Sequence, residues 1–400
     1  MGPSAAGVRV ALKASYKAKS KVKAKPKPRA KAYKKPSAKS SGSGGAPTPQ
    51  PSSTGRIERP LLRTIASAGL VSYASDCTGL DAGAMALRNI LPQFKHQWVS
   101  EVEPAYMKVL QATHPDVNMY FGDVTLRSDE DLDPFANSVT IYTSGFPCTV
   151  FSQGGNQKGM SDPNIGLLSF YIVLTICKVL PDMFILENVP EFALDQRHHH
   201  QFDLTLRMLR NAHDGLYNIY WKVLNSKSHG SPAQRRRLYI VGLRRDKTQL
   251  GWVWPAERPA VELRSILDPA TPILAQHDAD LASLPPFALN NLAHGLEKVN
   301  EMIDTDPSTK AGPWVVDIGV SKSRRKSCNP TFNSMPTITK CRAKGRHYYI
   351  SGRGLMSEIE LMRCQGFDPK RIVVPHGGAP RPSLGDGGQR YDGVGHGRAY

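Results

Sequence analysis

Seven short runs rich in β-branched and aromatic residues alternate with stretches of helical length, and this alternation constrains the fold more than any other feature of the 400-residue chain. The runs are LVSYASDC, HQWVSEVE, NMYFGDV, VTIYTSGF, DMFILENV, IYWKVLN and RLYIVGL. Strands that alternate with helices predict a parallel or mostly parallel sheet covered on both faces. We therefore expect an α/β fold with a doubly wound sheet. The apolar stretch from Ile165 to Leu180 is interrupted by polar residues and is short for a bilayer, which indicates a buried core helix.

Most of the positive charge lies at the N-terminus. The formal net charge is +18, and Met1 to Ser40 holds 11 Lys and 2 Arg but no Asp or Glu. This Lys-, Ala- and Pro-rich composition offers little to bury and predicts disorder over residues 1–60. Such a tail suits sequence-independent binding of nucleic-acid phosphates, and equally a solubilising or nuclear-import segment. We expect a nuclear location, although the composition also fits a prokaryotic or viral source.

The six cysteines show no paired metal-ligand spacing. We therefore expect reduced thiols and no metal site. The three histidines at His198 to His200 also lack ligand spacing, and we expect them to be exposed.

Ligands of doubly wound sheets lie beyond the carboxyl ends of the strands. After the first run, Gly79 and Gly83 permit a close backbone approach. The second run ends near Glu101, which could hold two ribose hydroxyls, and the third near Asp123, which could accept from an adenine amine. These signals in three successive units predict a cofactor that contains adenosine.

The fourth and fifth runs deliver a thiol and a carboxyl group to the same edge. Cys148 follows a proline, and although a lone cysteine is by default a buried structural residue, Glu187 ends the neighbouring run. Arg235 and Arg237, two positions apart, should point the same way on a strand. These groups suit methylation of a pyrimidine at carbon 5, because that carbon becomes nucleophilic once a thiolate adds to carbon 6 and an acid assists at ring nitrogen 3.

Five motifs, in order, carry a resemblance to a known family: PCTVFS, QKGMSDPNIGLL, ENV, SPAQRRRLYIVG and MSEIELMRCQGF. From about Val71 to Pro369 the chain resembles the cytosine-5 DNA methyltransferases. The resemblance implies a Rossmann-like, class I methyltransferase fold with a small target-recognition region. It also implies S-adenosylmethionine as cofactor, and double-stranded DNA as partner with the target cytosine rotated out of the duplex. We expect a monomer that does not bind membranes.

The resemblance assigns roles to individual residues. Cys148 would be the nucleophile, Glu187 would contact ring nitrogen 3, and Arg235 and Arg237 would stabilise the active loop and the base. The implied cofactor-binding residues are Cys77, Thr78, Gly79, Glu101, Val102, Asp123, Pro147 and Leu167. The implied substrate-loop residues are Ser152, Gln153, Gly154, Gly155 and Asn188.

The predicted organisation has five parts. A basic tail over 1–60 precedes a catalytic, cofactor-binding domain over 67–267. A target-recognition region follows over 268–328, with a basic exit, SKSRRKSCNP, that suits phosphates. A segment over 329–370 returns to the catalytic domain, and 371–400 is a second tail for which we expect disorder.

Two departures from the family pattern leave alternatives open. Where the family has Phe-x-Gly-x-Gly, this chain has Cys77 to Asp81, and Asp81 would either tolerate an unusual backbone angle or repel the carboxylate of the cofactor. The closing Gly-Asn-x-Val segment of the family is also missing after QGFDP, so it is either replaced from elsewhere or lost. The alternatives are a transfer-RNA cytosine methyltransferase, whose usual Cys-Phe-Thr is not found here, and a catalytically silent DNA-binding relative.

Overall fold

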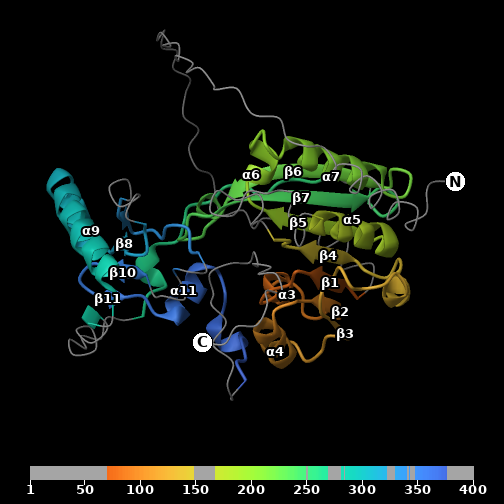
Figure 1. The fold of residues 1–400 in the computed structure, drawn as a ribbon, viewed down its shortest axis with the longest axis horizontal. Coiled ribbons are helices and arrows are strands. Elements are labelled where there is room, and N and C mark those ends of the chain that lie inside the picture. Colours follow the sequence, from red (N-terminus) through yellow and green to blue (C-terminus); the bar gives the residue numbers. More distant parts are fainter. Residues whose placement is uncertain are drawn as a thin grey trace, which may run out of the picture. The chain divides into compact units, whose positions relative to one another are not determined.

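A seven-stranded sheet organises the larger part of the chain (Figure 1). The structure is a computed structural model that describes residues 70–147, 167–248, 251–268, 281–282, 284–321, 329–339, 342 and 347–375. The strand order is β3-β2-β1-β4-β5-β7-β6. The strands are β1 Ser72–Asp76, β2 Lys95–Ser100, β3 Met119–Phe121, β4 Ile141–Ser144, β5 Met183–Asn188, β6 Tyr217–Asn225 and β7 Arg236–Arg244. All seven predicted runs therefore contain strands.

The sheet is mostly parallel, as predicted. β1 to β5 pair in parallel, whereas β7 pairs antiparallel with both β5 and β6. The strand order reverses at β1, which lies between β2 and β4, and ligands of such sheets bind at this switch point. The confirmed α/β, Rossmann-like class of fold thus places a binding site beyond the end of β1.

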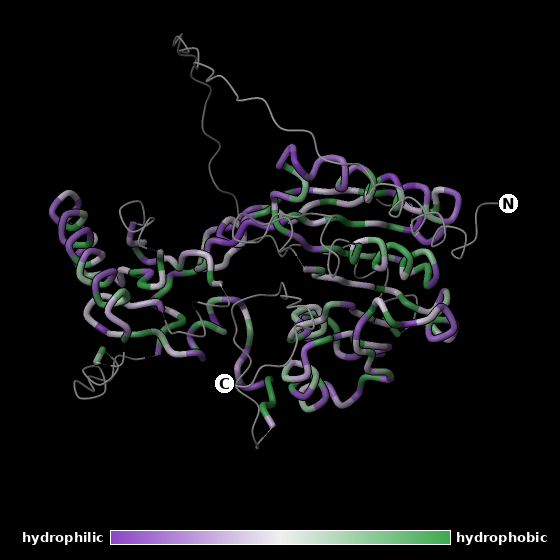
Figure 2. The backbone as a smooth tube through the Cα atoms, viewed as in Figure 1, coloured by the Kyte–Doolittle hydropathy of each residue, from purple (hydrophilic) through white to green (hydrophobic). Residues whose placement is uncertain are grey.

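Five helices belong to this sheet: α3 Ala82–Arg88, α4 Pro104–Thr113, α5 Leu168–Val179, α6 Glu191–Leu194 and α7 His199–Asn211. α5 is hydrophobic almost throughout (Figure 2), and most of its side chains are buried. It supplies Ile172 and Ile176 to a core that also contains Trp98 and Phe184. The apolar stretch is therefore a core helix. No helix within the described ranges is both long enough and apolar enough to cross a membrane.

A buried ion pair ties the strand ends together. Arg127 donates from Nη1 and Nη2 to the two carboxylate oxygens of Asp76, over 2.8 and 2.6 Å. Trp98 on β2 and Tyr142 on β4 donate to the same carboxylate, over 2.9 and 2.8 Å. A buried charge is tolerated when it is paired and fully hydrogen-bonded, as Asp76 is. The ends of β1, β2 and β4 are thus held in one arrangement.

A second, smaller sheet has the order β11-β10-β8-β9. Its strands are β8 Trp314–Asp317, β9 Thr331–Phe332, β10 Tyr348–Ile350 and β11 Gly354–Leu355. α9, Pro286–Thr305, packs on β8 so closely that a Cβ at Gly295 would lie 2.3 Å from Val316. The sheet therefore joins a strand of the predicted target-recognition region to strands of the predicted return segment.

The return segment contains a helix, α11 Glu358–Cys364, which begins with a capping box between Ser357 and Glu360. Short 3₁₀ turns occur at Glu130–Phe135, Ser226–Ser228, Leu263–Ser265, Pro307–Ala311 and Pro369–Arg371. The basic tail, most of the basic exit and residues 376–400 lie outside the described residues. The predicted domain boundaries stay predictions.

The expected exposure of His198 is wrong. This side chain is 2% exposed, whereas His199 and His200 are exposed. His198 precedes the first turn of α7, and burial lowers the pKa of its imidazole. It packs as a neutral residue at a helix start, which its place in a run of three histidines does not reveal.

Candidate active site

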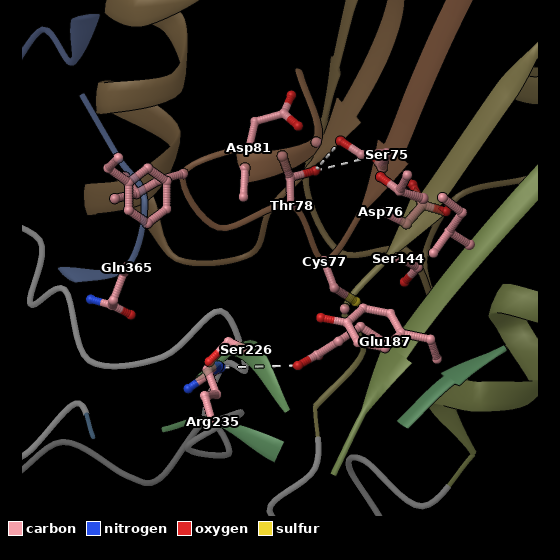
Figure 3. A pocket seen from close by; sticks show the side chains of 18 of the residues that line it. Ser75, Asp76, Cys77, Thr78, Asp81, Ser144, Glu187, Ser226, Arg235 and Gln365 are labelled. Carbon is pink, nitrogen blue, oxygen red and sulfur yellow. Dashed lines mark hydrogen bonds and ion pairs between the residues drawn. The ribbon is translucent and has the colours of Figure 1, made fainter. Parts of the chain in front are cut away.

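A cavity of about 400 Å³ lies at the carboxyl ends of β1, β4 and β5 (Figure 3). One wall is the turn that follows β1 and the start of α3. A second wall contains Glu187 and Arg235, and a third contains Gln365 and Phe367. Four segments far apart in the sequence therefore enclose one space at the switch point of the sheet.

The turn after β1 has an unusual backbone. Cys77, Gly79 and Asp81 have φ angles of 52°, 60° and 58°, in the left-handed region that disfavours most side chains. Thr78 holds the turn against β2, because its N–H donates to Ser100 O over 3.0 Å and its Oγ1 accepts from Ser100 N over 3.1 Å. The turn is therefore fixed to the sheet at its centre.

Asp81 adopts the unusual backbone angle, and its carboxylate is held by the protein. Oδ1 accepts from the hydroxyl of Tyr73 over 2.7 Å and from Ala84 N over 3.1 Å, so it caps α3. Oδ2 lies 3.1 Å from Nε2 of His96. Burial alone would raise the pKa of Asp81, but His96 and Tyr73 outweigh it and hold the pKa below its usual value. A carboxylate engaged in this way is poorly placed to repel a ligand.

Tyr73 connects this network to β4. Its hydroxyl also bonds with Oγ1 of Thr143 over 2.7 Å. A Cβ at Gly83 would lie 2.1 Å from the same hydroxyl, so the first turn of α3 requires glycine there. Tyr73 and His96 thus hold Asp81, and with it the turn after β1, in place.

Glu101 is bonded to the backbone of two turns. Oε2 accepts from Gly79 N over 2.9 Å and Oε1 accepts from Glu103 N over 2.8 Å. The residue is 2% exposed, and burial raises the pKa of its carboxyl to about 7. Glu101, which directly follows β2, therefore holds in place the turn that follows β1.

The cavity brings together only some of the predicted cofactor residues. Cys77 and Thr78 line it. The other predicted residues are not part of its described wall; these are Gly79, Glu101, Val102, Asp123, Pro147 and Leu167. Val102 is 37% exposed, and Asp123 accepts from Thr125 N over 2.8 Å.

The predicted carboxyl and arginines do meet. Nε of Arg237 lies 2.7 Å from Oε1 of Glu187, and Nη2 of Arg235 lies 4.0 Å from the same oxygen. Arg237 lies on β7, which pairs with β5 so that Tyr239 faces Glu187. The antiparallel β5–β7 pairing thus delivers both guanidinium groups to the carboxylate at the end of β5, as Figure 3 shows for Arg235.

Asn188 fixes the segment that leads to the predicted nucleophile. Its Nδ2 donates to Phe146 O over 3.3 Å, and its Oδ1 accepts from Val189 N over 2.8 Å. Pro147 is buried and is the last residue described before 148–166. Cys148 and the predicted loop residues Ser152, Gln153, Gly154 and Gly155 lie outside the described residues.

The thiol of Cys77 lines the cavity but is unsuited to attack. Burial raises its pKa well above the usual value, and the charges of Asp76 and Glu101 raise it further. A thiol must ionise to act as a nucleophile. We therefore assign Cys77 a structural role in the turn after β1.

Three potential metal ligands lie outside the described wall of the cavity. Ligand atoms of His96, His114 and Asp116 lie within 4.8 Å of one another. However, Arg88 donates to both oxygens of Asp116, over 3.0 and 3.2 Å, and contacts Nδ1 of His114. A guanidinium group bonded to two of the three ligands disfavours a metal ion there.

The sequence did not point to several residues of this site. Tyr73 and His96 read as ordinary strand residues, and the one signal was the departure at Asp81, which needs a buried partner. Gln365 and Phe367 lie within the motif MSEIELMRCQGF, in which the sequence predicted no site residue. Nothing in their spacing places them near β1.

Comparison with known proteins gives a family. A family model described as C-5 cytosine-specific DNA methylase matches residues 71–374. The Type II methyltransferase M.NlaIV of Neisseria lactamica is 32% identical over 178 residues, which cover 44% of this chain and 40% of that protein. The orphan methyltransferase M.SPRI of Bacillus phage SPR is 33% identical over 180 residues, covering 44% and 39%.

The chain thus spans about 40% of the length of these curated relatives. They come from a bacterium and a bacteriophage, so they do not support the nuclear location expected from the tail. Among solved structures, the S. pombe Dnmt2 methyltransferase aligns with 79% of this chain and 92% of its own, at 13% identity and a TM-score of 0.46.

Proposed function

We propose that this chain, which belongs to the C-5 cytosine-specific DNA methylase family, transfers a methyl group from S-adenosylmethionine to carbon 5 of a cytosine in DNA. The observation that carries the proposal is the single cavity that Glu187 and Arg235 share with the left-handed turn after β1. An acid that can contact the cytosine and a backbone turn that can approach S-adenosylmethionine therefore line the same cavity.

The described residues fit the cofactor. A volume of about 400 Å³ lies within the range of small-molecule sites. The cavity has apolar walls at Leu80, Tyr106 and Phe367 and polar groups at Thr78 and Ser144. Glu101 would take part by holding the turn after β1 in place, because its Oε2 accepts from Gly79 N.

The protein would prepare the cytosine for attack. With the base flipped into the cavity, the thiolate of Cys148 adds to carbon 6, and the electron pair of the 5,6 double bond moves onto carbon 5. Glu187, in its carboxylic acid form, donates a hydrogen bond to ring nitrogen 3, which makes carbon 6 more easily attacked, while Arg235 and Arg237 hold its carboxyl group in place. Bound S-adenosylmethionine supplies the electrophilic methyl group. A base then removes the proton from carbon 5, the bond from sulfur to carbon 6 breaks, and the aromatic ring is restored.

The experiment is a covalent trap. Duplex DNA that contains 5-fluorocytosine is incubated with the full chain and S-adenosylmethionine, and with a Cys148→Ser variant. Fluorine cannot leave as a proton does, so the wild-type protein should stay attached and shift on a denaturing gel. A shifted band that persists in the variant would refute Cys148 as the nucleophile, and no band with either protein would refute the proposed activity.

Two alternative functions predict different results. The first is an RNA methyltransferase, which should give a stronger shifted band when transfer RNA replaces the DNA duplex. A silent DNA-binding relative requires salt-sensitive DNA affinity without cofactor binding. The engaged carboxylate of Asp81 weakens one reason for that alternative, since the altered turn need not exclude the cofactor.

A further inference from the structure

We propose that the chain segment after α11 forms a wall of the cofactor site, and that Phe367 and Gln365 contact bound S-adenosylmethionine. The inference rests on the proposed function, because it names a contact of the same cavity.

The first support is position. Cys364, Gln365 and Phe367 line the cavity together with Leu80 and the rest of the turn after β1. Figure 3 shows the Gln365 side chain across the cavity from Cys77 and Glu187. The segment therefore closes the side of the cavity that the central strands leave open.

The second support is that the segment is anchored at both ends. α11 ends at Cys364, and the chain turns sharply off the helix at Gly366, which has a φ of 84°, while Phe367 N donates to Met362 O over 3.1 Å. Ser231 Oγ donates to Cys364 O over 3.4 Å, so this end is also joined to the loop before β7.

The far end of the segment is bonded to the helices beside the cavity. Arg371 Nη1 donates to Oδ1 of Asn89, the C-cap residue of α3, over 2.7 Å. Val373 N donates to Oγ1 of Thr113, the last residue of α4, over 3.0 Å. The chain is thus bonded to the rest of the protein both before and after Phe367, which gives Phe367 a defined place in the cavity wall.

The third support is the chemistry of the wall. Phe367 lines the cavity together with the apolar side chains of Leu80 and Tyr106, and Glu187 and Arg235 supply charged groups to the same cavity. An apolar wall next to a backbone turn suits the carbon skeleton of S-adenosylmethionine, and the amide of Gln365 can both donate and accept.

The test measures cofactor binding without DNA. The full chain and the variants Phe367→Ala and Gln365→Ala are titrated with S-adenosylmethionine and with S-adenosylhomocysteine by calorimetry. Phe332→Ala is the matched control, because Phe332 is also partly exposed but lies on β9 and outside the cavity. We expect Phe367→Ala to raise Kd about tenfold for both ligands, which corresponds to about 1.4 kcal/mol, and Gln365→Ala about threefold. Phe332→Ala should leave Kd unchanged.

The outcomes separate the two proposals. Wild-type protein that binds neither ligand contradicts the proposed function itself. Wild-type protein that binds, with both wall variants folded and at wild-type Kd, overturns the inference and leaves the proposed function standing. If Phe367→Ala does not fold, Phe367→Leu and Gln365→Ala carry the test, and wild-type Kd in both overturns it. A rise in KM for S-adenosylmethionine with an unchanged KM for DNA would support the contact.

Discussion

Oδ2 of Asp81 lies 3.1 Å from Nε2 of His96, and both side chains are buried. The pair lies behind the turn at which the family has a glycine in place of the aspartate. An aspartate in a left-handed turn is tolerated when its side chain has local partners, and here Tyr73 and the N-terminus of α3 supply them.

Replacing Asp81 should therefore destabilise the fold although glycine suits the backbone angle. Asp81→Gly removes the helix cap, takes away the carboxylate beside His96 and leaves the Tyr73 hydroxyl its bond to Thr143 but not its bond to Asp81, and we expect a loss of about 2 to 4 kcal/mol in the free energy of unfolding. Denaturant titration measures it. His96→Phe in the same chain should recover part of the loss, and strict additivity of the two changes would contradict the pairing.

Glu187 should matter for chemistry and not for cofactor binding. Glu187→Gln removes the ion pair with Arg237 and the acid at the base, so the rate of methyl transfer should fall by about 10² to 10⁴. Single-turnover assays on duplex DNA measure the rate, and calorimetry should show a cofactor Kd within about twofold of wild type. Glu191→Gln, on the adjoining α6, is the control and should retain the wild-type rate.

Asn188 should position the segment that carries Cys148. Asn188→Ala removes the bond to Phe146 O and lets this segment shift, and small misplacements of a reacting group cost about ten- to a hundredfold in rate. Trapping on 5-fluorocytosine should slow by that factor while the final yield stays high. Asn218→Ala, on β6, should trap at the wild-type rate, and equal slowing in both variants would indicate a general loss of structure.

Glu101 should make stability depend on pH. Its carboxyl is protonated more readily in the folded protein, with a pKa of about 7 against an ordinary value near 4.5. Between these values the folded state binds the extra proton, so this contribution to stability is fully present below pH 4.5 and is lost as the pH rises through 7. Glu101→Gln lacks this titration.

The measurement is the difference in unfolding free energy between wild type and Glu101→Gln. It should favour wild type more at pH 5 than at pH 8, by roughly 1 to 3 kcal/mol. A difference that does not change with pH would show that Glu101 titrates normally. Comparing the two proteins at each pH cancels the titration of other groups.

The sequence predicted the architecture well because the pattern of strands and helices is local. Each of the seven β-rich runs contains a strand, and the apolar stretch contains α5. The meeting of Glu187 with Arg237 also followed, since both lie at the ends of neighbouring strands. That Phe367 lines the same cavity as the turn after β1 was not predictable, because it depends on where α11 ends in space. The engagement of Asp81 by Tyr73 and His96 depends on side chains from two other strands.

The smaller sheet has a consequence for transplanting the predicted target-recognition region between relatives. β8 pairs with β10 and β9, which follow it beyond residue 328, and α9 packs on the same strand. A transplant limited to residues 268–328 would separate β8 from every strand that it pairs with. The transferable module is instead the continuous stretch from α9 to β11, and chimeras cut inside that stretch should be insoluble whichever target they were meant to read.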